Sequence, residues 1–307
     1  MALPPPRWTA AQLGTAASEA TEDFRQQRLA ESRKTYLAQI DRYRREVEEL
    51  FAATDDLRDI ARMRTELLAG AERLEAIRYL TGPPISADDL RVIAGTPLSP
   101  VRLAAEPGIG DRIVETIMQL IDRDRFPWIE EGRGPTMDER AAAVGATSTL
   151  LAASRLQTMR RNESRTEQEN AVKERLRAGG LEEVAPQRID SLRDAPAAGQ
   201  FSGESLFGTR KADIVIGLFD GRVMPIECKV SNSSTNSIKR LNNDAQVKAV
   251  NWISEFGHRS TVPAAVLSGV YQVRHLVQAQ DAGLTLFWTH DIEALVAFVL
   301  GTGETAG

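Results

Sequence analysis

The chain has 307 residues, a formal net charge of −5 and a hydrophobic content of 42%, which suit one large domain or two ordinary ones. It contains no run of about 18 apolar residues that could span a membrane. Its N-terminus lacks a signal-peptide pattern, and Cys228 is its single cysteine. We therefore expect no membrane span, no disulfide framework, no cysteine-based zinc site and a cytoplasmic location.

The sequence of the first half indicates only helices after a Pro-rich start. Its helical segments are charged and rich in Ala and Leu, with apolar residues at helical spacing. The predicted helices cover residues 16–53, 55–79, a short stretch from Ser86, 111–123 and 136–159. Ser86 and Thr136 are suitable N-cap residues, because their side chains can accept a hydrogen bond from a free backbone amide of the first turn.

The second half changes character after Gly179 and Gly180. Two apolar, β-branched runs joined by Asp220 and Gly221 predict a β-hairpin. Strands are expected at residues 212–219, 223–230, 264–270 and 284–288, and helices at 238–256, 273–280 and 291–300. The chain therefore predicts an α+β fold, with an all-helical N-terminal half followed by a mixed sheet flanked by helices.

The charged residues of this hairpin are the candidate site. Residues two apart on a strand share a face, so Glu227 and Lys229 project together while Cys228 faces the opposite side, toward the core. The turn lies midway between positions 213 and 227, and antiparallel pairing therefore places Asp213 opposite the Glu227 end. Two carboxylates and one ammonium group are expected to meet there.

Each of these residues also has an ordinary structural interpretation. A Glu and a Lys two apart on a strand often form a solvated face, and an Asp before an apolar strand is often a turn residue. The run 223–230 is otherwise apolar, however, and charges in a buried strand need a partner. A divalent cation would neutralise two neighbouring carboxylates, and hard oxygen ligands select Mg²⁺.

This pattern resembles the PD-(D/E)xK nuclease superfamily, in which an Asp starts a strand, Glu-x-Lys lies on the next strand and a preceding helix carries a third acid. The resemblance covers residues 163–290. Glu169 matches the acid on the helix, with Glu163 and Glu167 as competitors. The chain departs from the motif at Ala212, where the name-giving pattern has Pro.

A more specific likeness spans both halves of the chain. The phrases that carry it are IDRDRFPW (121–128), RLQTMRRNESRTEQE (155–169), GESLFGTRKADIVI (203–216), IECKVSNSSTNSIKRLNND (226–244) and GLTLFWTHD (283–291). Together they resemble the XamI family of type II restriction endonucleases. The resemblance implies cleavage of duplex DNA at a short palindrome, with GTCGAC as a candidate, and a DNA methyltransferase that protects the host. A palindrome also implies a homodimer.

The superfamily resemblance implies a set of catalytic roles. Asp213, Glu227 and the Cys228 backbone carbonyl would bind Mg²⁺, and Glu169 would reach the metal through water or bind a second ion. Lys229 would contact the attacking water and the scissile phosphate, and would accept a proton if its pKa is depressed. Hydrolysis would leave a 5′-phosphate.

Two basic segments suit contacts to DNA in spite of the negative net charge. Residues 155–177 hold seven basic and four acidic side chains, and residues 229–248 hold four and one. Such clusters matter more for DNA binding than the net charge does. The expected contact residues are Arg160, Arg161, Arg165, Asn232, Ser234, Thr235, Asn236, Lys239 and Arg240. A solvated basic helix face and an ordinary Ser/Asn loop remain the alternatives.

The resemblance also suggests a division of labour. We interpret residues 1–155 as a helical region for DNA clamping, dimerisation or both, and residues 156–307 as the nuclease core. Two other functions stay open. The same core could serve a structure-specific repair or junction nuclease, or the acids and the lysine could be coincidental in a non-catalytic DNA-binding protein.

Overall fold

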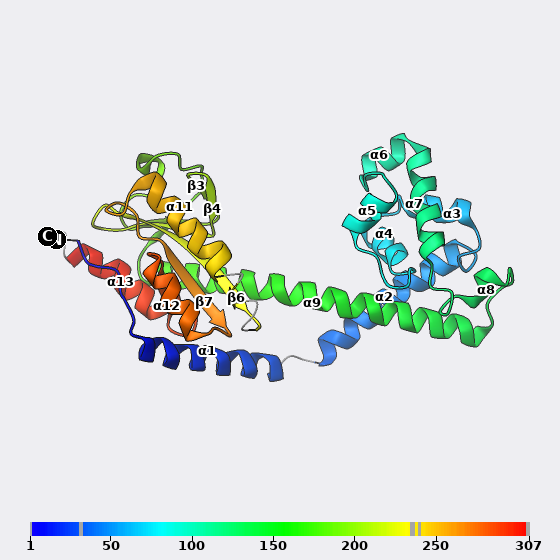
Figure 1. The fold of residues 1–307 in the computed structure, drawn as a ribbon, viewed down its shortest axis with the longest axis horizontal. Coiled ribbons are helices and arrows are strands. Elements are labelled where there is room, and N and C mark those ends of the chain that lie inside the picture. The colour runs from blue at the N-terminus through cyan, green and yellow to red at the C-terminus, as the bar shows by residue number, and fades with distance from the viewer. Residues whose placement is uncertain (1, 31–32, 234–236, 239–240, 305–307) are drawn as a thin grey trace. The chain divides into compact units, whose positions relative to one another are not determined.

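The structure, a computed structural model, describes residues 2–30, 33–233, 237–238 and 241–304, without side-chain detail at 33–35, 107 and 160–164 (Figure 1). The chain divides into two compact units, Met1–Glu31 with Arg160–Gly307, and Ser32–Met159. The first unit contains both β-sheets. No helix of the described part has the length and apolar character needed to cross a bilayer.

The unit Ser32–Met159 is built from helices. They are α2 (Arg33–Ala53), α3 (Ile60–Glu66), α4 (Ala71–Arg78), α5 (Ala87–Ile93), α6 (Pro100–Ala105), α7 (Pro107–Leu120), α8 (Pro127–Glu130) and the first part of α9 (Met137–Ala178). Phe51, Phe126 and Trp128 pack edge to face in its core. Both predicted caps are confirmed, because Ser86 and Thr136 accept hydrogen bonds from backbone amides in the first turns of α5 and α9.

Three helix boundaries expected from the sequence are wrong. Where one helix was expected over residues 16–53, the structure describes α1 (Ala10–Ala30) and α2 in different units, and residues 31 and 32 lie outside the described residues. Residues 55–79 form α3 and α4, because Gly70 before α4 has a φ of 144°, where other residues are strained. The helix expected to end near residue 159 continues as α9 to Ala178.

The other unit holds a six-stranded mixed sheet, which confirms the predicted α+β character. In sheet order its strands are β1 (Glu182–Val184), β2 (Gln200–Ser202), β5 (Ile214–Gly217), β6 (Val223–Ser231), β7 (Ala264–Gly269) and β8 (Thr285–Trp288). β5 pairs with β6 antiparallel, as the hairpin prediction requires, and β6, β7 and β8 run parallel. A separate antiparallel pair joins β3 (Ser205–Phe207) to β4 (Arg210–Ala212).

Helices cover both faces of this sheet. Ile226, Cys228 and Val266 pack with the end of α9 and with α13 (Ile292–Glu304) on one face. Ala265 and Leu267 pack on the other face with α1, α12 (Val273–Asp281), the π-helical turn η2 (Leu241–Ala245) and α11 (Gln246–Phe256). Cys228 is buried, as predicted. The neighbouring residues of β6 therefore face the α11 side, where the candidate site lies.

Candidate active site

The β5–β6 hairpin sets the geometry of the candidate site. Ile214 pairs with Ile226, and the Asp213 amide donates a hydrogen bond to the Ile226 carbonyl over 2.9 Å. Asp213 lies one residue beyond this pairing, and its carboxylate reaches the Cys228 amide, next to Glu227 on β6. The exposed fractions of Asp213 and Glu227 are 4% and 0%, so two carboxylates are buried side by side at one end of the hairpin.

Each oxygen of the Asp213 carboxylate has a donor. The Cys228 backbone amide donates to Oδ2 over 2.8 Å, which ties the side chain to strand β6. The Arg165 guanidinium, from helix α9, donates to Oδ1 over 2.7 Å. The carboxylate is thus oriented by the neighbouring strand and neutralised by a helix-borne cation.

Glu227 is held between two lysines. The Lys248 ammonium group lies 2.7 Å from Oε1 and the Lys229 ammonium group lies 2.5 Å from Oε2. Burial raises the pKa of Glu227 above its usual range, and the charge of Asp213 adds to the rise, while Lys229 and Lys248 oppose it. A carboxylate in this position is stabilised chiefly by its two cationic partners.

Lys229 lies between Glu227 and Asp244, whose carboxylate is 2.7 Å from the ammonium nitrogen. Burial alone would lower the pKa of Lys229, but the charges of Glu227 and Asp244 and their hydrogen bonds together outweigh it, so the pKa is raised. The depressed pKa that a proton-accepting Lys229 requires is therefore not found. Lys229 is suited to act as a fixed positive charge.

Glu169 joins the site through an arginine. Arg165 lies one turn earlier on α9, and its Nε is 2.7 Å from the Glu169 carboxylate, while its Nη2 holds Asp213. Hydrogen bonding to Glu169 is the main cause that raises the pKa of Arg165, although burial opposes it. Arg165, expected from the sequence to contact DNA, thus lies among the acids of the candidate site.

The remaining predicted DNA contacts are only partly placed. Asn232 is exposed at the end of β6. Arg160 and Arg161 lie on α9, but their side chains lie outside the described part of the structure. Three positions of the polar loop after β6 and two beyond it, all expected to contact DNA, fall outside the described residues altogether: Ser234, Thr235, Asn236, Lys239 and Arg240.

Two residues of the site were missed by sequence reasoning. Lys248 contacts Glu227 and also donates to the Lys211 carbonyl over 2.9 Å, two residues before Asp213. Asp244 binds Lys229 and lies 3.9 Å from Lys248. Their i, i+4 spacing after the Glu-x-Lys strand was the available signal, since it places both on one helix face.

The acids of this site suit a hard cation. Within the described residues, no three His, Cys, Asp or Glu side chains are arranged to share a metal ion. Asp213 and Glu227 nevertheless offer hard oxygen donors on facing strands, and Mg²⁺ needs only one or two carboxylates when water and phosphate complete its shell. The Arg165 guanidinium between Glu169 and Asp213 shows that a positive charge is already accommodated there.

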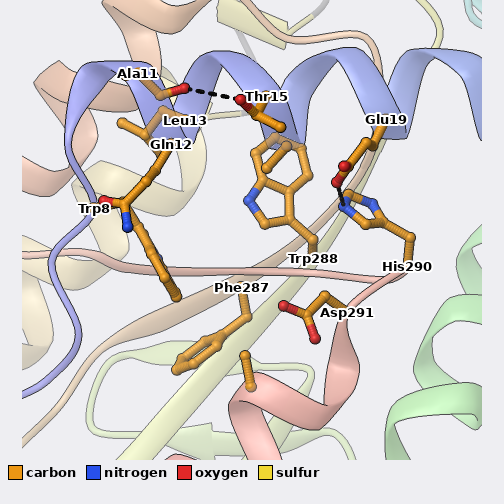
Figure 2. Close-up of a pocket in the computed structure, with 12 residues that line it drawn as sticks. Trp8, Ala11, Gln12, Leu13, Thr15, Glu19, Phe287, Trp288, His290 and Asp291 are labelled. Atoms are coloured by element: carbon orange, nitrogen blue, oxygen red, sulfur yellow. Dashed lines mark hydrogen bonds and ion pairs between the residues drawn. The ribbon is translucent and has the colours of Figure 1, made fainter.

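A cavity of about 340 Å³ lies elsewhere in the same unit, between α1 and the region of β8 and α13 (Figure 2). Trp8, Trp288 and Phe287 line it. His290 points toward Glu19, 3.3 Å away, and its ring packs against Trp288. None of the predicted site residues lines this cavity, so it offers no support for their roles.

Comparison with known proteins identifies a relative that covers most of the chain. The chain is 45% identical over 271 residues to the type II restriction enzyme XamI of Xanthomonas campestris pv. amaranthicola, covering 87% of this chain and 98% of that enzyme. A crystal structure of protein VC1899 from Vibrio cholerae aligns with 88% of this chain at 13% identity and a TM-score of 0.28, which is too low to support an inference; this chain spans 57% of that protein.

The sequence model of the XamI restriction endonuclease family matches residues 55–288. That range includes both strands of the hairpin, helix α11 and all of α9. It therefore contains every acid and base of the candidate site. With this match and the close relative, the chain belongs to the XamI restriction endonuclease family.

Proposed function

We propose that this chain is a Mg²⁺-dependent type II restriction endonuclease that hydrolyses duplex DNA at a short palindromic site. One observation carries the proposal: the buried Asp213 carboxylate accepts a hydrogen bond from the amide of Cys228, the residue between Glu227 and Lys229 on strand β6, within the range that the family model matches. Phosphodiester hydrolysis needs neutralisation of charge on the phosphate and an oriented water. Paired carboxylates with an adjacent ammonium group suit both needs.

Asp213, Glu227 and the Cys228 carbonyl would hold Mg²⁺, and Glu169 would reach the metal through water or bind a second ion. When bound, a divalent ion lowers the pKa of a coordinated water and stabilises negative charge on the phosphate. Asp213 keeps its orientation through the Cys228 amide, and Glu227 is fixed by two lysines. Both carboxylates are therefore held in fixed orientations before a metal binds.

Lys229 supplies positive charge beside these acids. Its raised pKa keeps it protonated, so we assign it to hydrogen-bonding the attacking water and the scissile phosphate, where it stabilises developing charge. Attack in line with the leaving 3′-oxygen leaves a 5′-phosphate. The proton of the attacking water would then pass to solvent or to the phosphate and not to Lys229.

The DNA and protein partners follow from the same proposal. Residues 156–307 would form the nuclease core, against whose sheet α1 packs, and residues 1–155 would clamp DNA, mediate dimerisation or both. A homodimer matches the two-fold symmetry of a palindrome, for which GTCGAC is the candidate. The contacts expected from the sequence at Arg160, Arg161 and the loop after β6 would grip phosphates or read bases. A DNA methyltransferase would protect the host.

Digestion of phage DNA by the purified full-length chain tests the proposal. We expect discrete fragments in the presence of Mg²⁺, and end sequencing should give one palindromic site with 5′-phosphate ends. An excess of EDTA serves as the control and should stop the reaction. Cutting confined to branched or flapped DNA would favour the repair or junction nuclease instead. No metal-dependent cutting of any DNA would favour a non-catalytic DNA-binding protein.

A further inference from the structure

Arg165 makes an unusual set of contacts for a half-exposed arginine. Its Nε lies 2.7 Å from Glu169 and its Nη2 lies 2.7 Å from Asp213, while Glu204 is 3.7 Å away. The Arg165 side chain is 53% exposed, whereas those of Glu169 and Asp213 are 19% and 5% exposed. The guanidinium therefore reaches inward from a solvated helix face to bridge two largely enclosed acids.

The two acids bind neighbouring nitrogens on one edge of the same guanidinium. Their oxygens consequently converge on a single positive group, in the way that two carboxylates converge on a shared metal ion. Oδ1 of Asp213 is occupied by Arg165, and its Oδ2 accepts the Cys228 amide. A divalent cation that used Asp213 Oδ1 would have to displace the guanidinium, since two cations cannot share this oxygen without strong repulsion.

We propose that Arg165 is an internal competitor of the divalent cation: in the DNA-free protein it occupies the interval between Glu169 and Asp213, and the metal binds there only when it leaves. This inference rests on the proposed function, because it assumes that these acids bind metal. The long, half-exposed side chain can swing out without disturbing the core. Arg165 thereby sets how tightly the resting enzyme holds its metal.

Titration of the DNA-free, full-length protein with Mn²⁺ in a calorimeter tests this role without any cleavage. Arg165→Gln should tighten Mn²⁺ binding on the order of tenfold, a usual size for coupling between two sites. Arg177→Gln is the matched control, because Arg177 is on the same helix, is 48% exposed and pairs with Glu183. It should leave Mn²⁺ affinity unchanged.

Arg165→Lys gives a second measurement, since one ammonium group cannot bridge both acids as the planar guanidinium does. Its affinity should lie between those of the wild type and Arg165→Gln. Equal or weaker Mn²⁺ binding by Arg165→Gln would overturn the proposal. Asp213→Asn separates the two claims. If Asp213→Asn binds Mn²⁺ with wild-type affinity, the metal site itself is refuted. If Asp213→Asn loses Mn²⁺ binding while Arg165→Gln keeps the wild-type affinity, only the competition is refuted.

Discussion

Glu227 is the most enclosed acid of the candidate site, and the surrounding charges explain how it is tolerated. Its two oxygens face Lys229 and Lys248, and both lysines also approach Asp244. Acidic and basic side chains alternate in the ring formed by Glu227, Lys229, Asp244 and Lys248. Glu227 has no exposed surface. Removing one partner from such a group is costly, because the remaining charge keeps its desolvation penalty.

Lys248→Met should therefore lower the free energy of unfolding by about 1–3 kcal/mol, because Glu227 loses the donor to Oε1. Lys248→Arg keeps the charge and should restore most of the stability. Lys211→Met is the control: its ammonium group pairs with Glu204 at the surface, and such pairs contribute about 0–1 kcal/mol. Urea unfolding measures all three.

The double variant Glu227→Gln/Lys248→Met sharpens this test. If the two side chains stabilise each other, the double variant should lose less stability than the two single variants added together. Additive losses, or a Lys248→Met protein as stable as the wild type, would mean that Lys248 does not hold Glu227.

Part of this site is predictable from sequence because it depends on a short-range rule. The number of residues between Asp213 and Glu227 and the position of the turn fix their pairing across one hairpin. Lys248 and Asp244 could not be assigned in that way, because the docking of a helix on a sheet depends on contacts between distant residues. The pairing of Arg165 with Asp213 could not be assigned for the same reason, since the two residues are 48 positions apart in the sequence.

At the scale of elements, helix α9 is the clearest departure from expectation. The sequence predicted a helix that ends near residue 159 and another that carries Glu169, although no Pro interrupts the 42 residues and Arg, Glu and Gln, which are good helix formers, make up most of the charged stretch near the middle. The strands β1 to β4 were not expected, because each has only three residues. Alternation between faces cannot be recognised over so short a run.

The first turn of α9 carries a pH-dependent cap. Thr136 and Glu139 exchange hydrogen bonds between side chain and backbone amide, and Arg133 pairs with the Glu139 carboxylate. The hydrogen bond from Arg133, followed by that from the Thr136 amide, lowers the pKa of Glu139 to about 2, below its ordinary value of 4.5. Its stabilising effect is therefore complete above pH 4.5 and is lost as the pH falls through about 2.

Glu139→Gln should consequently lower the Tm at neutral pH, and the difference from the wild type should shrink as the pH falls from 4.5 toward 2. Glu106→Gln is the control, because Glu106 pairs with Arg102 on the surface and caps no helix through its side chain. Thermal unfolding of the three proteins at several pH values checks this. A gap that is absent at neutral pH, or that does not change with pH, contradicts it.

At the scale of the whole molecule, the predicted class of fold holds while its arrangement does not follow from the sequence. A mixed sheet flanked by helices is indicated by the alternation of strands and helices. The order of the strands is not, because it depends on long-range pairing between segments that local patterns cannot rank. Residues 2–30 pack against the sheet through Leu13, Ala17 and Ala20 of α1. No local sequence pattern predicts this contact.

Charge is also distributed unevenly over the molecule. The chain is acidic in total, yet the segments 155–177 and 229–248 are each locally basic. Both adjoin the buried acids, since the first includes Arg165 and the second begins at Lys229. Basic segments beside a group of buried acids suit the approach of a polyanionic substrate.

The claim that the site around Asp213 cleaves DNA is tested most directly by comparing Asp213→Asn with Asp220→Asn. Asp220 lies at the turn of the same hairpin, is similarly enclosed and pairs with Arg222, so it controls for damage to the fold. We predict that Asp213→Asn cuts duplex DNA about a hundredfold more slowly or worse. It should still bind that DNA, while Asp220→Asn keeps cutting. An Asp213→Asn protein that cuts at the wild-type rate would contradict the assignment of the site.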